Sequence, residues 1–151
     1  MIKKIEIFTD GSSLGNPGRG GWGAVITEND KVIAELGGYD KETTNNRMEL
    51  MGAIEAIKYI AKKHKTDEVV IHTDSAYVLG GVTTWIHNWE KNNWRTANKK
   101  PVLNKELWQE LISLTRAFKG HLSWQKVKGH SGHVHNDRAD EIATTKAEQQ
   151  I

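Results

Sequence analysis

Two aspartates follow apolar segments that end in the same short motif. Residues 5–12 and 69–76 each contain an apolar run, then Thr-Asp, then a small residue. If the two runs are adjacent parallel strands, the carboxylates of Asp10 and Asp74 emerge at the same edge of the sheet, where α/β proteins bind ligands. Like charges brought together there repel and raise one pKa, unless a cation offsets them. The repeated motif therefore predicts a cation site.

Two further carboxylates lie near the starts of expected helices. Glu49 comes three residues after Asn46, and Asp140 falls in the first turn of the last helix. Each carboxylate also has an ordinary alternative role, in a turn, a helix cap or a capping box. As a set, the four offer the hard oxygen ligands that suit Mg²⁺ or Mn²⁺. Two such ions hold the attacking and leaving oxygens of a phosphodiester cleavage.

A loop with glycines carries three histidines, His130, His133 and His135. A zinc site is one interpretation, because histidine-rich tracts bind metals. The flanking glycines favour a flexible loop over a fixed tetrahedral cage. A histidine in such a loop, beside a metal site, can move protons or help product leave.

The segment of residues 85–101 is basic and rich in tryptophan. Four cations stand against Glu90 alone, a net charge of +3, although the whole chain carries only +2. The tryptophan spacing fits a helical stripe packed on the body of the protein. Cations interleaved with aromatic rings also suit a nucleic-acid groove, and the two interpretations are compatible. The residues concerned are Trp85, Trp89, Trp94, Lys91, Arg95, Lys99 and Lys100.

Length and composition limit the class of protein. The chain has 151 residues, 37% of them hydrophobic and 26% charged, which suits one globular domain spanning residues 1–151. No apolar run approaches the roughly 20 residues of a membrane helix. The absence of cysteine excludes disulfides, thiolate metal sites and cysteine nucleophiles, and fits a reducing, cytoplasmic setting.

Hydrophobic periodicity predicts a mixed sheet with helices on both faces. Residues 5–9, 22–27 and 32–36 are expected to form an antiparallel meander. Two further strands are expected to be parallel. The remaining expected elements are a helix over 46–63 with Thr44, Asn45 or Asn46 as its cap, a strand at 69–71, short helices at 75–79 and 82–90 interrupted by Gly80-Gly81, a helix around 107–118, a strand at 121–127 and a helix from Asp137.

Four motifs in this order resemble type I ribonuclease H in its bacterial single-domain form. They are Phe8-Thr9-Asp10-Gly11-Ser12, residues 44–50, Thr73-Asp74-Ser75 and residues 128–133. The basic segment resembles that family's protrusion, and we call residues 85–101 the handle. The resemblance runs essentially from end to end. It implies a ribonuclease H-like fold with a five-stranded sheet, and endonucleolytic hydrolysis of the RNA strand of RNA–DNA hybrids, leaving 5′-phosphate and 3′-hydroxyl ends.

The resemblance also implies roles for individual residues. Asp10, Glu49, Asp74 and Asp140 would bind two Mg²⁺ ions, with Mn²⁺ as a substitute, and His130 would be the catalytic loop histidine. Asn16, Asn45 and Asn46 would read the minor groove, where 2′-hydroxyls distinguish RNA from DNA. Thr44 and Asn104 would take a DNA phosphate. The further substrate-binding residues would be Gly11, Tyr77, Trp85, Asn88, Trp89, Lys91, Trp94, Arg95, Lys99 and Lys100.

Two positions depart from the family pattern. Ala76 stands where many relatives carry a glutamine, and Glu42 stands near a frequent arginine, with Lys41 beside it. Both departures bear on substrate affinity. Two rival functions remain at this stage: a hybrid-binding module without chemistry, and a transposase-like or resolvase-like core that cuts DNA. The four carboxylates argue against the first rival, and the handle with Asn45 and Asn46 against the second. We expect a monomer.

Overall fold

The computed structural model describes residues 3–64, 67–127 and 133–149, in which five strands form one mixed sheet. The strand order is β3-β2-β1-β4-β5. The β1–β2 and β2–β3 pairs are antiparallel, and the β1–β4 and β4–β5 pairs are parallel, as predicted. The strands are β1 (Lys4–Ser13), β2 (Gly18–Glu28), β3 (Lys31–Thr43), β4 (Glu68–Thr73) and β5 (His121–Lys126).

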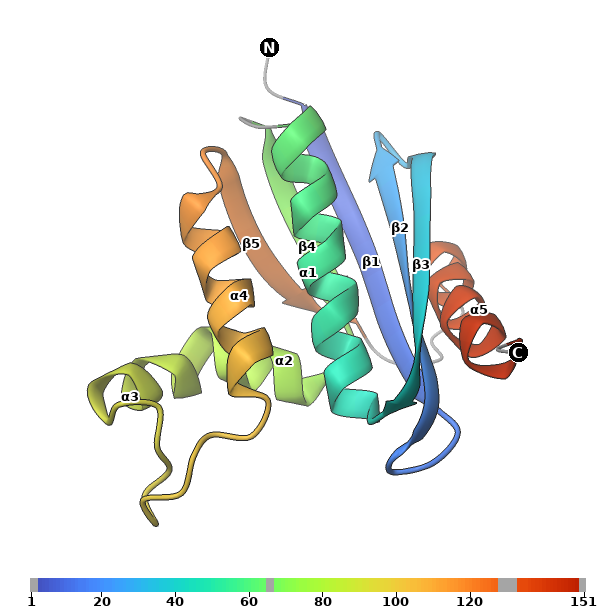
Figure 1. Cartoon of the computed structure of the whole chain (residues 1–151). Helices are drawn as coiled ribbons and strands as arrows, with labels where there is room; N and C mark the ends of the chain where they lie inside the picture. Colours follow the sequence, from blue (N-terminus) through green and yellow to red (C-terminus); the bar gives the residue numbers. More distant parts are fainter. Residues whose placement is uncertain (1–2, 65–66, 128–132, 150–151) are drawn as a thin grey trace.

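Helices cover both faces of this sheet, which confirms the predicted ribonuclease H-like α/β architecture (Figure 1). The α1 and α4 helices lie on one face and α5 on the other (Figure 1). None of the helices in the described ranges has the length and apolar character that crossing a membrane requires. The helical elements are α1 (Asn45–Lys63), α2 (Ala76–Gly80), the π-helical turn η1 (Gly81–Trp85), α3 (Ile86–Lys91), α4 (Lys105–Ala117) and α5 (Val134–Glu148).

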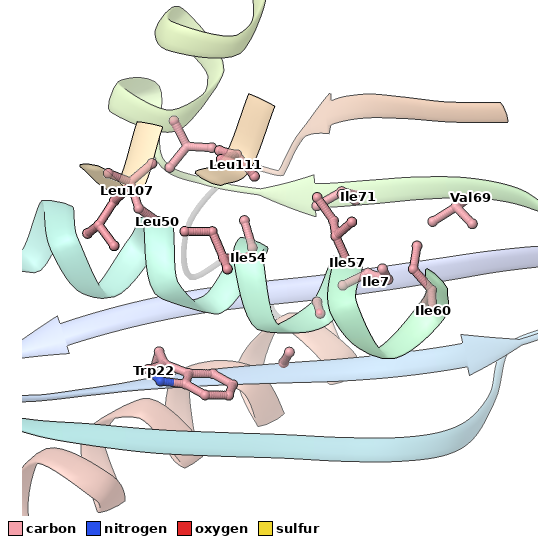
Figure 2. Packing of buried hydrophobic residues seen from close by; sticks show 14 of the residues in the cluster. Ile7, Trp22, Leu50, Ile54, Ile57, Ile60, Val69, Ile71, Leu107 and Leu111 are labelled. Atoms are coloured by element: carbon pink, nitrogen blue, oxygen red, sulfur yellow. The ribbon is translucent and has the colours of Figure 1, made fainter. Parts of the chain in front are cut away.

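The main hydrophobic core lies between the sheet and the α1–α4 pair. Figure 2 shows Leu50, Ile54 and Ile57 of α1 between the strands and the α4 residues Leu107 and Leu111. All of these side chains are buried, and such burial stabilises a fold by about 25 cal/mol per Å² of apolar surface. A smaller cluster of Phe8, Val25 and Ala139 attaches α5 to the opposite face. The two cores hold the carboxyl end of β1 between α1 and α5.

Three strands are longer than the sequence patterns predict. β1 continues to Ser13 and β2 begins at Gly18, whereas the sequence pattern predicts an end at residue 9 and a start at residue 22. The pairs Ser12↔Gly21 and Ser13↔Gly20 carry the ladder through this glycine-rich stretch, because backbone pairing does not require β-favouring side chains. β3 likewise runs to Thr43, beyond the expected end at residue 36. The alternative role of Asp10 in a turn is therefore wrong, because Asp10 lies inside β1 opposite Gly23.

The predicted break at Gly80-Gly81 is also wrong. The chain is helical without interruption from Ala76 to Lys91, and the glycines fall where α2 passes into η1. Gly81 has ordinary helical φ and ψ angles of −65° and −52°. A methyl group at Gly81 would fall inside the ring of Trp108, which is fully buried. The glycine is therefore required by close packing against α4.

We predict that Gly81→Ala lowers the free energy of unfolding by at least about 2 kcal/mol, because Trp108 has no room to move away from the added methyl group. Gly52→Ala in α1 is the matched control, since the nearest atom to its added methyl group would be the Asp10 carbonyl oxygen at 3.5 Å. This control is expected to stabilise the protein by about 0.5–1 kcal/mol. Urea unfolding of both variants measures the difference. Equal stabilities for the two variants would contradict the packing argument.

Candidate active site

Three carboxylates meet at the carboxyl end of β1 and β4. Asp10 lies in β1, Asp74 directly follows β4, and Glu49 reaches them from the second turn of α1. One carboxylate oxygen from each lies within 4.8 Å of the other two. The parallel pairing of β1 with β4, in register at Phe8↔His72, produces this meeting, as the repeated Thr-Asp motif predicts.

The capping alternatives for these carboxylates are wrong. The N-cap of α1 is Thr44, whose hydroxyl oxygen accepts the Arg47 amide at 3.2 Å, so Glu49 is too far along the helix for a capping box. The N-cap of α2 is Ser75, which accepts the Val78 amide at 3.1 Å. Glu49 and Asp74 thus have no part in closing their helix ends.

Close approach of α1 to β1 depends on Gly11. A side chain there would meet the backbone of Met48 and Glu49 and the Glu49 carboxylate itself. The Gly11 amide donates to Asp10 Oδ1 at 2.9 Å, which orients the Asp10 carboxylate. Glu49 is only 8% exposed, and its Oε1 has no hydrogen-bond partner among the described residues. A buried carboxylate oxygen without a partner indicates a ligand that is positively charged.

Burial and mutual repulsion shift the pKa values of the cluster. Burial is the main cause that raises the pKa of Asp10 from 3.8 to about 7, with the charge of Asp74 adding to it. Burial also raises the pKa of Glu49 well above its usual value, and the Asp10 charge contributes. Divalent cations reverse both effects, because they favour the ionised form of a carboxylate ligand. These donors fit Mg²⁺ or Mn²⁺.

A cavity of about 380 Å³ surrounds the cluster, and we call it the carboxylate cavity. No lysine, arginine or histidine is among the described residues that line it. Asp140 of α5 lines this cavity but is outside the tight group of three oxygens. It lies in the second turn of α5, because the helix begins at Val134, earlier than predicted. The lining residues are Asp10, Gly11, Ser12, Asn45, Asn46, Glu49, Asp74, Ser75, Ala76, Tyr77 and Asp140.

A second cavity, of about 530 Å³, lies next to the first, because Asn45 and Asn46 line both. It also brings together Asn16 and Thr44. Four polar side chains expected to contact substrate thus lie along one continuous surface. The departure at Glu42 lies elsewhere, exposed on β3, and the described lining of the second cavity includes neither it nor Lys41.

The handle combines packed rings with exposed cations, as the two compatible interpretations predict. Trp89 and Trp94 pack against the main core, whereas Trp85 is 39% exposed. The ring centroids of Trp85 and Trp89, and those of Trp89 and Trp94, are 6.0 Å apart. The cations of the handle, and Asn88, are exposed: Lys91, Arg95, Lys99 and Lys100.

The described histidines do not form a zinc site. The rings of His133 and His135 pack on each other with centroids 5.6 Å apart, and the Phe8 ring packs on both, 4.8 Å from His133 and 5.3 Å from His135. His135 Nε2 also lies 3.0 Å from Asp30 Oδ1. In the described ranges the carboxylate cluster is the one group of potential metal ligands, and His130 lies outside these ranges.

The side-chain interactions of Arg47 are not predicted by the sequence patterns. Arg47 reaches Asn104 and Glu106, at the start of α4, from the first turn of α1. Its place in the motif at residues 44–50 was the one sequence feature that could have drawn attention to Arg47. Its partners could not be predicted, because they lie 57 and 59 residues away along the chain. Asn104 in turn contacts Tyr77, so two expected substrate residues belong to one hydrogen-bonded group.

Comparison with known proteins identifies sequences that are similar to this chain. A family model described as RNase H matches residues 2–148. The ribonuclease H of Mesorhizobium japonicum is 54% identical over 143 residues, covering 95% of this chain and 77% of that protein. The ribonuclease H of Escherichia coli is 50% identical over 147 residues, covering 97% of this chain and 91% of that protein.

Solved structures give the same result. LC9-RNase H1, described as a type 1 RNase H with the type 2 active-site motif, has a TM-score of 0.86 and 31% identity, covering 100% of this chain and 75% of that chain. LC11-RNase H1, solved in complex with an RNA/DNA hybrid, has a TM-score of 0.73 and 26% identity, covering 95% of this chain and 96% of that chain. The family-model match over residues 2–148 spans all four carboxylates and the handle.

We predict that Asp10→Asn stabilises the metal-free protein at neutral and alkaline pH. The folded state holds a proton on Asp10 up to about pH 7, whereas the unfolded chain releases it near 3.8, so folded-state stability falls as pH rises through this window. Removing the charge should raise the free energy of unfolding by at least about 1 kcal/mol at about pH 8 and change it little at about pH 4.

Urea unfolding in chelator at the two pH values measures this difference. Asp137→Asn is the control, because Asp137 is exposed at the start of α5 and outside the carboxylate cavity. A metal-free Asp10→Asn variant that is less stable than the parent at alkaline pH would show that the carboxylates do not repel one another.

Proposed function

This chain belongs to the ribonuclease H family, and we propose that it is an endonuclease that hydrolyses the RNA strand of RNA–DNA hybrids. The observation that carries the proposal is the carboxylate cluster, with its unpartnered Glu49 Oε1 and its described lining free of basic side chains. Such a site attracts divalent metal, and two metal ions held by carboxylates can hydrolyse a phosphodiester. The polar side chains along the second cavity and the exposed cations of the handle support a nucleic acid as substrate.

Asp10, Glu49, Asp74 and Asp140 would hold two Mg²⁺ ions, and Mn²⁺ would serve in their place. Metal bound there would lower the pKa of an attacking water and would offset the negative charge that develops on the scissile phosphate. Cleavage would leave 5′-phosphate and 3′-hydroxyl ends. The protein's own contribution is geometric. Gly11 lets α1 approach β1, and its amide orients Asp10, so the ligands are held before substrate arrives.

Discrimination between RNA and DNA would come from the asparagines. Asn16, Asn45 and Asn46 line the two connected cavities, and their amides both donate to and accept from 2′-hydroxyls. Gly11 also lines the carboxylate cavity, where its backbone would face the cleaved strand, while the space of its missing side chain is taken by the α1 backbone at Met48 and Glu49. Ala76 lines the same cavity with a methyl group and offers no hydrogen bond there.

The handle would hold the other strand. Its exposed cations, Lys91, Arg95, Lys99 and Lys100, suit phosphates, and Trp85 presents an exposed ring beside Asn88. Trp89, Trp94 and Tyr77 would form the wall of this channel. His130, from its motif, would move protons or help product leave. We propose that one domain, acting as a monomer in the cytoplasm, performs the whole reaction.

We predict that the purified protein cuts the RNA strand of a labelled RNA–DNA hybrid in Mg²⁺ and leaves RNA duplex and DNA duplex intact. Asp10→Asn should reduce this activity by at least roughly 10²-fold, because it removes a metal ligand. Asp137→Asn is again the control. Cleavage of DNA, or hybrid cleavage that persists in chelator, would overturn the proposal, and hybrid binding without any cleavage would favour the rival binding module.

Replacing the four handle cations by alanine should weaken hybrid binding and flatten its salt dependence. Each lost phosphate contact should reduce the slope of log K against log salt by about 0.9. The control is a variant in which four other lysines become alanine: Lys3, Lys4, Lys62 and Lys63. It loses the same charge, but at the ends of β1 and α1 that lie away from the carboxylate cluster. Titration at several salt concentrations compares the two variants. Equal slopes would mean that the handle does not contact phosphate.

A further inference from the structure

A group of hydrogen bonds joins α1, α2 and α4 beside the carboxylate cavity. Arg47 Nη1 donates to Asn104 Oδ1 at 3.1 Å and to Glu106 Oε1 at 2.6 Å. Asn104 Nδ2 donates to the Tyr77 hydroxyl oxygen at 3.1 Å. Trp108 Nε1 donates to that same oxygen at 3.0 Å. Arg47 is thereby connected to Tyr77 through a single intervening side chain.

The group is held in place by burial. Asn104 is 8% exposed and Trp108 is fully buried. Asn104 precedes α4 with a φ of 61°, a left-handed conformation that asparagine tolerates better than most residues. The Tyr77 ring also packs on the Trp108 ring, with centroids 5.1 Å apart. Because Asn104 and Trp108 are buried and the Tyr77 ring is packed on Trp108, the directions of the hydrogen bonds among these three side chains are fixed.

Donor and acceptor chemistry decides which way each group points. A guanidinium and an indole only donate, so Asn104 must present its oxygen to Arg47 and its nitrogen to Tyr77. The Tyr77 oxygen therefore accepts two hydrogen bonds, and its own proton points elsewhere. Among the described residues none accepts that proton or the second Asn104 Nδ2 proton.

Thr44 offers a comparable hydroxyl group. Its Oγ1 accepts the backbone amide of residue 47 at 3.2 Å, and none of the described residues accepts the Thr44 hydroxyl proton. Tyr77 lines the carboxylate cavity and Thr44 lines the cavity beside it. Uncharged donors without acceptors, on the surface where a nucleic acid would lie, suit phosphate oxygens, which only accept.

We propose that Arg47 is a positioning residue for hybrid binding. By holding Asn104 Oδ1 it sets the orientation of the Asn104 amide, and through that amide the direction of the Tyr77 hydroxyl proton. Both groups then donate to phosphate oxygens of the bound hybrid, while Arg47 itself stays engaged with Asn104 and Glu106. This inference rests on the proposed function for its ligand, and it assigns Arg47 no contact with the hybrid.

A double-mutant cycle tests the proposal. The equilibrium dissociation constant for a labelled RNA–DNA hybrid is measured by fluorescence anisotropy in the Asp10→Asn background, so that the hybrid stays intact. Arg47→Met and Tyr77→Phe are each expected to weaken binding by about tenfold, the size of one hydrogen bond to a charged group. The double variant is expected to bind no more weakly than the weaker single variant, because Arg47 acts through Tyr77.

Lys58→Met is the matched control. Lys58 Nζ lies 3.0 Å from Glu110 Oε2, so it also pairs α1 with α4 and its loss removes one positive charge, but away from the two cavities. Binding by this variant should stay within about twofold of the parent, since exposed ion pairs contribute little. Arg47→Met should show the same salt slope as Lys58→Met, whereas a direct phosphate contact by Arg47 would lower its slope by about 0.9.

The kinetic readout separates positioning from general damage. With Asp10 intact, Arg47→Met should raise KM by about tenfold and leave kcat within about twofold. Additive losses in the double variant, a reduced salt slope or unchanged binding by Arg47→Met would each overturn the proposal. If Arg47→Met does not fold, Arg47→Lys answers the same question: it keeps a donor for Asn104 and should bind within about threefold of the parent, whereas a guanidinium fork on phosphate would not be replaced by lysine.

The outcome is separable from that of the proposed function. A parent protein that binds the hybrid and does not cut it overturns the proposed activity, and the binding cycle still decides the role of Arg47. A parent that binds no hybrid overturns the positioning role directly, because no phosphate is then present to receive the protons.

Discussion

Repulsion between carboxylates held together away from water is the interaction on which the rest of the structure depends. Asp10, Glu49 and Asp74 place oxygens within 4.8 Å of one another, and the raised pKa values of Asp10 and Glu49 express how unfavourable their joint ionisation is. Only a rigid scaffold keeps such groups close. The parallel β1–β4 pair supplies two of them, and the buried face of α1, packed between the sheet and α4, carries the third (Figure 2).

Trp108 connects this scaffold to the handle. Its ring fills the space above Gly81, lies 5.3 Å from the Trp89 ring and 5.1 Å from the Tyr77 ring, and donates to the Tyr77 hydroxyl. The handle therefore packs against the main core through its tryptophans. Because these aromatic rings face the core, the cations of the handle stay exposed, and the same segment can both pack and bind nucleic acid.

Charge is distributed in a way that the net value of +2 conceals. Exposed lysines and an arginine gather on the handle, while the carboxylate cavity gathers anions with no basic side chain in its described lining. The asparagines and hydroxyls that line the two cavities carry no charge. Under the proposed function, the handle would attract a nucleic-acid backbone, these neutral donors would hold it, and it would meet the carboxylates only with cations to offset the repulsion.

The amino-acid sequence by itself determined that the sheet is mixed, where the helices approximately lie, and that Asp10 meets Asp74. These features follow from hydrophobic periodicity and from the Thr-Asp repeat, which are local patterns. It did not determine how far β1 and β2 extend, since their glycine-rich ends are held by pairing and not by side-chain preference. Nor could it decide between capping and ligand roles for Glu49, which depended on Thr44 taking the cap. Only the tertiary structure brought Arg47, Asn104, Tyr77 and Trp108 into one group, because hydrogen bonds between residues up to 57 positions apart leave no periodic trace along the chain.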